Sequence, residues 1–134
     1  MISGRRSLDP PSNAFFRRMS SNARPPGVPV GKVLREGDLV SGFRLISTPG
    51  HTLGHASLLR DSDGLLFTAD AFGCLPRKIR VGVRQALCTD PPLAKRSAEK
   101  LLAEDFATVV MAHGPVLRED ARTRLQKTVE RCRY

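Results

Sequence analysis

Four short apolar runs, broken by turn-forming residues, constrain most strongly what this chain can fold into. They occupy residues 43–47, 56–60, 65–68 and 107–111. The first alternates apolar and polar positions over most of its length, and the last is rich in β-branched residues, as is typical of strands. Asp61-Ser62-Asp63-Gly64 is a hairpin turn signal between the second and third runs. We also expect short strands at 32–34 and 39–40, around a turn at 36–38.

The second half of the chain favours helices. Thr89 or Asp90 is expected to cap a helix that opens with Pro91-Pro92 and ends near residue 104. A last amphipathic helix is expected at 119–132. The residues predicted to be buried on these helices are Leu93, Ala94, Ser97, Leu101, Leu102, Ala121, Leu125 and Val129. Residues 71–88 fit no element clearly. The pattern predicts an α/β fold, a mixed sheet with covering helices.

Three of these strands are followed closely by side chains that can bind metals. The loop 47–55 contains His51 and His55, Asp70 follows the run that ends at 68, and His113 follows the last run. Imidazole and carboxylate ligands together suit zinc, iron and manganese. Glycine beside these histidines leaves room for a metal and a substrate. The sequence therefore predicts a metal site where the strand ends converge.

The chain has 134 residues, which is the usual size of one domain. We divide it into a basic, Pro/Ser-rich irregular segment or linker at 1–30, with a short helix at 13–19, and a folded part at 31–134. The net charge is +9, and the first 35 residues contain seven basic residues and one acidic residue. A basic arm can bind nucleic acid, but aromatic residues are scarce in it, so a solvated loop is favoured over a nucleic-acid partner.

The three cysteines, Cys74, Cys88 and Cys132, show no CxxC spacing and predict no disulfide framework. No apolar run approaches the roughly 20 residues that span a bilayer, and no secretory signal is recognised. We expect a cytoplasmic protein without a membrane partner.

Three motifs resemble the metallo-β-lactamase superfamily. The stretch from Thr48 to His55 (TPGHTLGH) resembles its third motif, FTAD ending at Asp70 its fourth, and His113-Gly114-Pro115 its fifth. Their order also fits, and the similarity runs from about Val33 to the C-terminus. The resemblance implies half of an αββα sandwich.

The resemblance also implies a function and roles for individual residues. It implies a metal-dependent hydrolase in which a metal-bound hydroxide attacks an ester, thioester, amide or phosphoester. One or two zinc ions are expected, with iron or manganese as alternatives. His51 and His113 would each ligate a metal, and Asp70 would bridge the metals as the catalytic carboxylate. His55, Thr52, Gly50 and Gly114 would be structural residues near the site.

One signature of the superfamily is missing. HxHxDH supplies most of the remaining ligands, and no histidine precedes His51. The chain thus resembles only the C-terminal half of the fold. Each metal would then have two protein ligands, fewer than a catalytic zinc normally has. We expect weak metal binding, low or no activity of the isolated chain, and an exposed apolar sheet face.

Two hypotheses follow from this departure. The chain contributes half of a hydrolase, completed by a separately encoded N-terminal half or a second copy and acting on a small molecule that the sequence does not name. Alternatively, it is a non-catalytic remnant or interaction module that pairs through the exposed sheet face.

Overall fold

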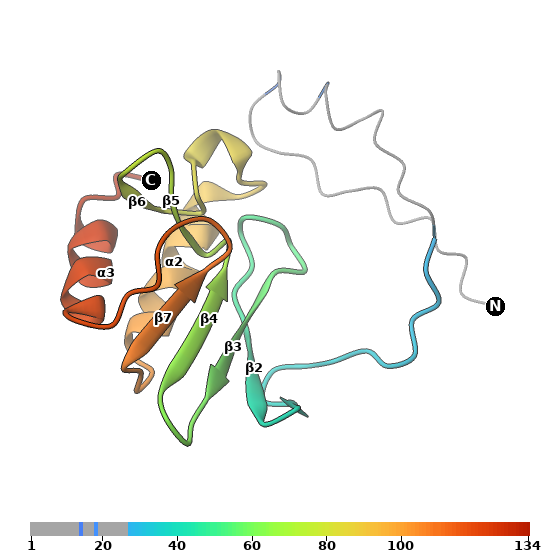
Figure 1. Ribbon diagram of the computed structural model, residues 1–134. Coiled ribbons are helices and arrows are strands. Elements are labelled where there is room, and N and C mark those ends of the chain that lie inside the picture. The colour runs from blue at the N-terminus through green and yellow to red at the C-terminus, as the bar shows by residue number, and fades with distance from the viewer. Residues whose placement is uncertain (1–13, 15–17, 19–26) are drawn as a thin grey trace.

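A mixed sheet organises the chain. The computed structural model describes residues 14, 18 and 27–134. Within that part, the main sheet has five strands in the order β1-β2-β3-β4-β7. Their bounds are β1 Leu39–Val40, β2 Phe43–Ser47, β3 Ala56–Arg60, β4 Leu65–Ala69 and β7 Thr108–Met111. Strands β1 to β4 pair antiparallel, and β7 joins β4 in parallel (Figure 1).

The strand predictions are largely confirmed. Strands β2 and β3 have the predicted bounds, β4 continues one residue further, and β7 begins one residue later than predicted. The strand predicted at 32–34 is wrong. These residues have no regular structure, and Val33 is 74% exposed. A strand needs a partner, and β2 pairs with β1 and β3 instead. The helix predicted at 13–19 lies outside the described residues, apart from Ala14 and Arg18.

Both predicted helices are present, and both are shorter than expected. Helix α2 spans Pro91–Leu102, and α3 spans Ala121–Glu130. Of the two caps considered, Asp90 is the N-cap of α2, and its carboxylate accepts a hydrogen bond from the backbone N–H of Leu93 at 2.9 Å. Leu93 and Leu102 are half-buried rather than buried. The remaining six residues predicted to be buried on these helices are buried.

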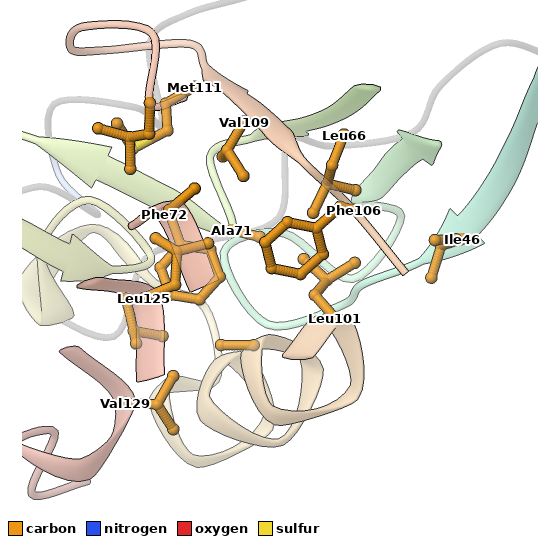
Figure 2. Close-up of a cluster of buried hydrophobic side chains, with 14 of the residues drawn as sticks. Ile46, Leu66, Ala71, Phe72, Leu101, Phe106, Val109, Met111, Leu125 and Val129 are labelled. Carbon is orange, nitrogen blue, oxygen red and sulfur yellow. The ribbon is translucent and has the colours of Figure 1, made fainter. Parts of the chain in front are cut away.

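The helices cover one face of the sheet and form the core with it. Alternate residues of the central strands point into this core, where they meet apolar residues of α2 and α3 (Figure 2). Ile46, Leu59, Leu66 and Val109, from four different strands, have no exposed surface. Burial of these side chains is the main favourable contribution to folding.

The opposite face of the sheet carries a row of apolar side chains. Leu45 is paired with Leu58, Leu58 with Phe67, and Phe67 with Val110, so the four residues lie side by side across β2, β3, β4 and β7. None of the four is fully buried, and Phe67 is 37% exposed. This matches the expected exposed sheet face.

Residues 71–88, which the sequence left unassigned, form a small hairpin and a helical turn. Strands β5 (Phe72–Cys74) and β6 (Ile79–Val81) pair antiparallel, and the 3-10 helix η1 follows at Gln85–Leu87. The hydroxyl of Tyr134 donates a hydrogen bond to the carbonyl of Val81 at 2.7 Å. Within the described ranges, no helix is long and apolar enough to cross a membrane. The boundary between 1–30 and 31–134 stays a prediction.

Candidate metal site

Three of the predicted site residues meet at one edge of the sheet. Strands β4 and β7 are parallel, and β2 runs in the same direction because it is antiparallel to β3. Their carboxyl ends therefore share an edge, from which Asp70, His113 and the loop with His51 project. Asp70 Oδ2 lies 3.7 Å from His51 Nε2, and Asp70 Oδ1 lies 3.5 Å from His113 Nε2. The structure places one carboxylate between two imidazoles.

Asp70 is positioned by an irregularity at the end of β4. The pairing of β4 with β7 shifts register between Phe67 and Ala69, and Ala69 has a positive φ of 47°. Such shifts redirect side chains next to functional sites. Oδ1 of Asp70 is buried and accepts no hydrogen bond from any described residue. A buried carboxylate oxygen without a donor is costly, and a cation bound there would compensate for that cost.

His51 is held from both its ring and its backbone. Its Nδ1 lies 3.3 Å from the carbonyl oxygen of Gly82, which can only accept a hydrogen bond. The Nδ1–H tautomer leaves the Nε2 lone pair facing Asp70, the usual arrangement of a metal-binding histidine. The carbonyls of His51 and Gly50 accept hydrogen bonds from the N–H groups of Thr89 (3.0 Å) and Asp90 (2.9 Å). The loop is therefore anchored to the start of α2.

Gly50 is required for this anchoring. It has a φ of 133°, and a Cβ on it would collide with the backbone of Ala94 in α2. Thr52 contributes through its carbonyl, which accepts hydrogen bonds from the N–H groups of Gly50 (2.9 Å) and His55 (3.3 Å). Both residues thus shape the loop rather than face the carboxylate.

Sequence reasoning missed the contribution of Gly82. It lies in the segment that showed no recognisable pattern, and it has a positive φ of 62°. A Cβ on Gly82 would collide with Cys88 Sγ. Cys88 has no exposed surface, and burial raises the pKa of its thiol to about 11. A glycine-valine pair before a short helical turn was the available signal, but nothing local connects it with His51.

His113 is held less tightly than His51. Its side chain is 52% exposed, against 19% for His51 and 28% for Asp70. Its carbonyl accepts a hydrogen bond from the N–H of Cys74 at 2.7 Å, and Gly114 packs against the same cysteine. No hydrogen bond to the ring of His113 comes from the described residues. The backbone of this loop is fixed, while the imidazole is oriented only by Asp70.

His55 occupies a different position from the other two histidines. Its Nδ1 lies 3.0 Å from the carbonyl oxygen and 2.9 Å from Oγ1 of Thr48, and its Nε2 accepts a hydrogen bond from the N–H of Asp70 at 3.0 Å. Burial lowers the pKa of His55, which favours the neutral ring. Both nitrogens are occupied, so His55 connects the histidine loop to the backbone of Asp70.

The pairs around Asp70 fit a shared metal site in geometry. Two ligands of one zinc ion, each bound at about 2.0–2.1 Å, lie about 3.3 Å apart at the tetrahedral angle. The two His–Asp distances are slightly longer than this, so a small closing movement would suffice. In the described part of the chain, no three His, Cys, Asp or Glu side chains come together as one metal-binding group. The arrangement is two His–Asp pairs that share a carboxylate.

Comparison with known proteins agrees with this geometry. The family model described as "Metallo-beta-lactamase superfamily" matches residues 4–113 of the chain. The chain belongs to the metallo-β-lactamase superfamily. The match ends at His113, and it begins earlier than the resemblance at Val33 suggested.

Curated relatives and solved structures of the superfamily are similar to parts of this chain. The hydroxyacylglutathione hydrolase of Chelativorans sp. (strain BNC1) is 31% identical over 97 residues, which are 69% of this chain and 36% of that protein. The enzyme of the same name from Rhodopseudomonas palustris (strain ATCC BAA-98 / CGA009) is 49% identical over 47 residues, 33% of this chain and 18% of that protein. The chain thus spans about a third or less of the length of these relatives.

Two solved structures confirm the fold. TTHA1623 in a di-iron-bound form aligns with a TM-score of 0.62 and 28% identity, covering 83% of this chain and 53% of that one. The metallo-beta-lactamase family protein TTHA1429 from Thermus thermophilus aligns with a TM-score of 0.60 and 26% identity, covering 84% and 38%. The predicted α/β fold of this superfamily is therefore confirmed.

Proposed function

We propose that this chain contributes the metal-binding half of a metallo-β-lactamase-type hydrolase site. The observation that carries the proposal is the buried Oδ1 of Asp70, which lacks a hydrogen-bond donor among the described residues and faces an imidazole nitrogen. His51 and His113 would each bind a metal through Nε2, and Asp70 would bridge the two positions. A metal bound there would supply Lewis-acid activation of water for hydrolysis.

The residues around these three would maintain the geometry. The Gly82 carbonyl fixes the tautomer of His51, and His55 fixes the backbone at Asp70. Zinc is the metal we propose, with iron or manganese as alternatives, because imidazole and carboxylate ligands serve all three. The metal-bound form of TTHA1623 contains iron, so the choice of metal needs measurement.

This half of the site offers each metal two protein ligands, whereas a catalytic zinc usually has three and a water. We propose that the remaining ligands come from a second polypeptide segment that packs on the apolar row Leu45–Leu58–Phe67–Val110. That row crosses four strands in register and is partly exposed. A separately encoded N-terminal half or a second copy of the chain could provide such a segment.

A hydroxyacylglutathione is the substrate to test first, because two similar proteins are named hydroxyacylglutathione hydrolases. The experiment measures bound zinc, iron and manganese by mass spectrometry and hydrolysis at each metal, for the chain alone and after addition of an N-terminal half carrying HxHxDH. We expect weak binding alone, with tighter binding and activity after mixing. Metal binding that Asp70→Asn leaves unchanged, while Glu99→Gln behaves identically, would sink the proposal.

The apolar row also favours a second candidate, a non-catalytic module that pairs through its sheet face. Size-exclusion chromatography with light scattering of Phe67→Ser separates the two. If the module hypothesis holds, the variant changes the association state while metal has no effect on it. If the hydrolase hypothesis holds, addition of metal strengthens association of the wild type.

A further inference from the structure

A cavity on the far side of the β5–β6 hairpin is lined largely by basic residues. It has a volume of about 610 Å³ and lies between β6, η1, α3 and the last residues of the chain. The C-terminus lies beside this hairpin (Figure 1). Pockets of about 300–1,000 Å³ are typical of small-molecule sites. His51, Asp70 and His113 do not line the cavity, so it is separate from the candidate metal site.

The hairpin side of this pocket is cationic. Its basic lining residues are Arg77, Lys78, Arg80 and Arg84. The guanidinium of Arg80 donates to the backbone carbonyls of Leu75 and Lys78. These partners are neutral, so the charge of Arg80 stays uncompensated. The side chains of Arg77, Lys78 and Arg84 are exposed, which leaves them able to reach a ligand.

The opposite side is cationic as well. Its basic lining residues are Arg124, Lys127, Arg131 and Arg133. The spacing of Arg124, Lys127 and Arg131 places them on one face of α3 and its C-terminal cap, where neighbouring like charges are destabilising. Attraction to the negative end of the helix dipole accounts for Lys127 and Arg131. It does not account for the four cations of the hairpin and η1 that lie opposite them.

No carboxylate balances this charge. The lining contains no Asp or Glu from the described part of the chain. Ion pairs of the described residues involve Arg44, Arg60, Lys100 and two histidines, and none of the eight pocket cations. Cations gathered around one cavity without counter-charges repel one another, and a bound anion removes that repulsion.

We propose that this pocket binds a phosphorylated small molecule of nucleotide size. Arginine guanidinium groups match phosphate oxygens in a bidentate geometry, and six of the eight pocket cations are arginines, which lie on two facing walls. Ile79 and Tyr134 also line the cavity and offer apolar surface to a base or sugar. A single strand of nucleic acid needs a groove that follows several phosphates, whereas these cations surround one bounded cavity.

The test is calorimetric titration of the full chain, freed of metal with EDTA, with ATP, pyrophosphate, adenosine and a single-stranded thymidine oligonucleotide. We expect ATP and pyrophosphate to bind and adenosine to bind at least twentyfold more weakly than ATP. The variant Arg124→Gln/Arg131→Gln should weaken ATP binding at least tenfold. The control Arg96→Gln/Arg118→Gln removes the same charge from exposed positions outside the pocket and should change ATP binding less than twofold.

Circular dichroism checks that both double variants fold. If the α3 variant does not, Arg77→Gln/Arg84→Gln on the opposite wall replaces it, with the same tenfold loss expected. Equal loss in the pocket and control variants, or no binding of ATP up to millimolar concentration, would overturn the proposal. An oligonucleotide that binds more tightly than ATP and is not displaced by ATP would also overturn it.

Discussion

The two histidines that face Asp70 are supported to very different degrees. His51 is 19% exposed, its Nδ1 faces the Gly82 carbonyl, and its loop is hydrogen-bonded to the start of α2. His113 is 52% exposed, and only its backbone is fixed. A ligand whose orientation is already fixed loses little conformational freedom on binding. The comparison therefore predicts that His51 contributes more to metal affinity than His113.

The largest effect is expected at the anchor of the His51 loop. In Gly50→Ala the new Cβ would meet the backbone of Ala94, which cannot move without displacing α2, at a positive φ. Overpacking and backbone strain together should lower the free energy of unfolding by about 3 kcal/mol. Urea denaturation measures it. Gly54→Ala in the same loop has open space around it and should change stability by less than about 0.5 kcal/mol. Equal effects at the two glycines would refute the anchoring.

Gly82→Ala should have a somewhat smaller effect, about 2 kcal/mol. The collision here is with the thiol of Cys88 rather than with backbone, so part of it can relax. The change also displaces the carbonyl that orients His51, and zinc affinity should fall with stability. In the Cys88→Ala background Gly82→Ala should cost about 1 kcal/mol less, a coupling that a double-mutant cycle measures. Strict additivity would show that the two residues do not meet.

The two histidines can be compared directly by substitution. His51→Ala should lower zinc affinity about tenfold more than His113→Ala, a difference of about 1.4 kcal/mol. Competition with a chelating dye gives both affinities. Equal losses would mean that the fixed orientation of His51 has no energetic value, and a larger loss at His113 would reverse the comparison.

The sequence predicted the elements with strong local patterns. Alternation specifies β2, and the residue spacing 121, 125, 129 specifies the buried face of α3. The strand predicted at 32–34 failed because a β-branched residue such as Val33 favours a strand only where another strand lies beside it. The hairpin of β5 and β6 escaped prediction because distant contacts, including that of Tyr134 with Val81, hold it in place.

The same limit applies to the site. Glycines and small residues around His51, Asp70 and His113 indicated a shared location, and the structure brings the three side chains together. The sequence separated His51 from His55 only through resemblance. Physical separation needed coordinates, because it rests on what each ring nitrogen contacts. Gly82 supports His51 from 31 residues away, a distance at which no local pattern operates.

The most direct test of the shared carboxylate uses the fact that the chain contains three histidines. With ¹⁵N-labelled histidine, NMR resolves each imidazole, and single His→Gln variants assign the signals. We predict that zinc shifts the Nε2 signals of His51 and His113, leaves His55 unchanged, and shifts neither ligand in Asp70→Asn. A zinc-induced shift of Nε2 in His55, or shifts of His51 and His113 that persist in Asp70→Asn, would contradict the account.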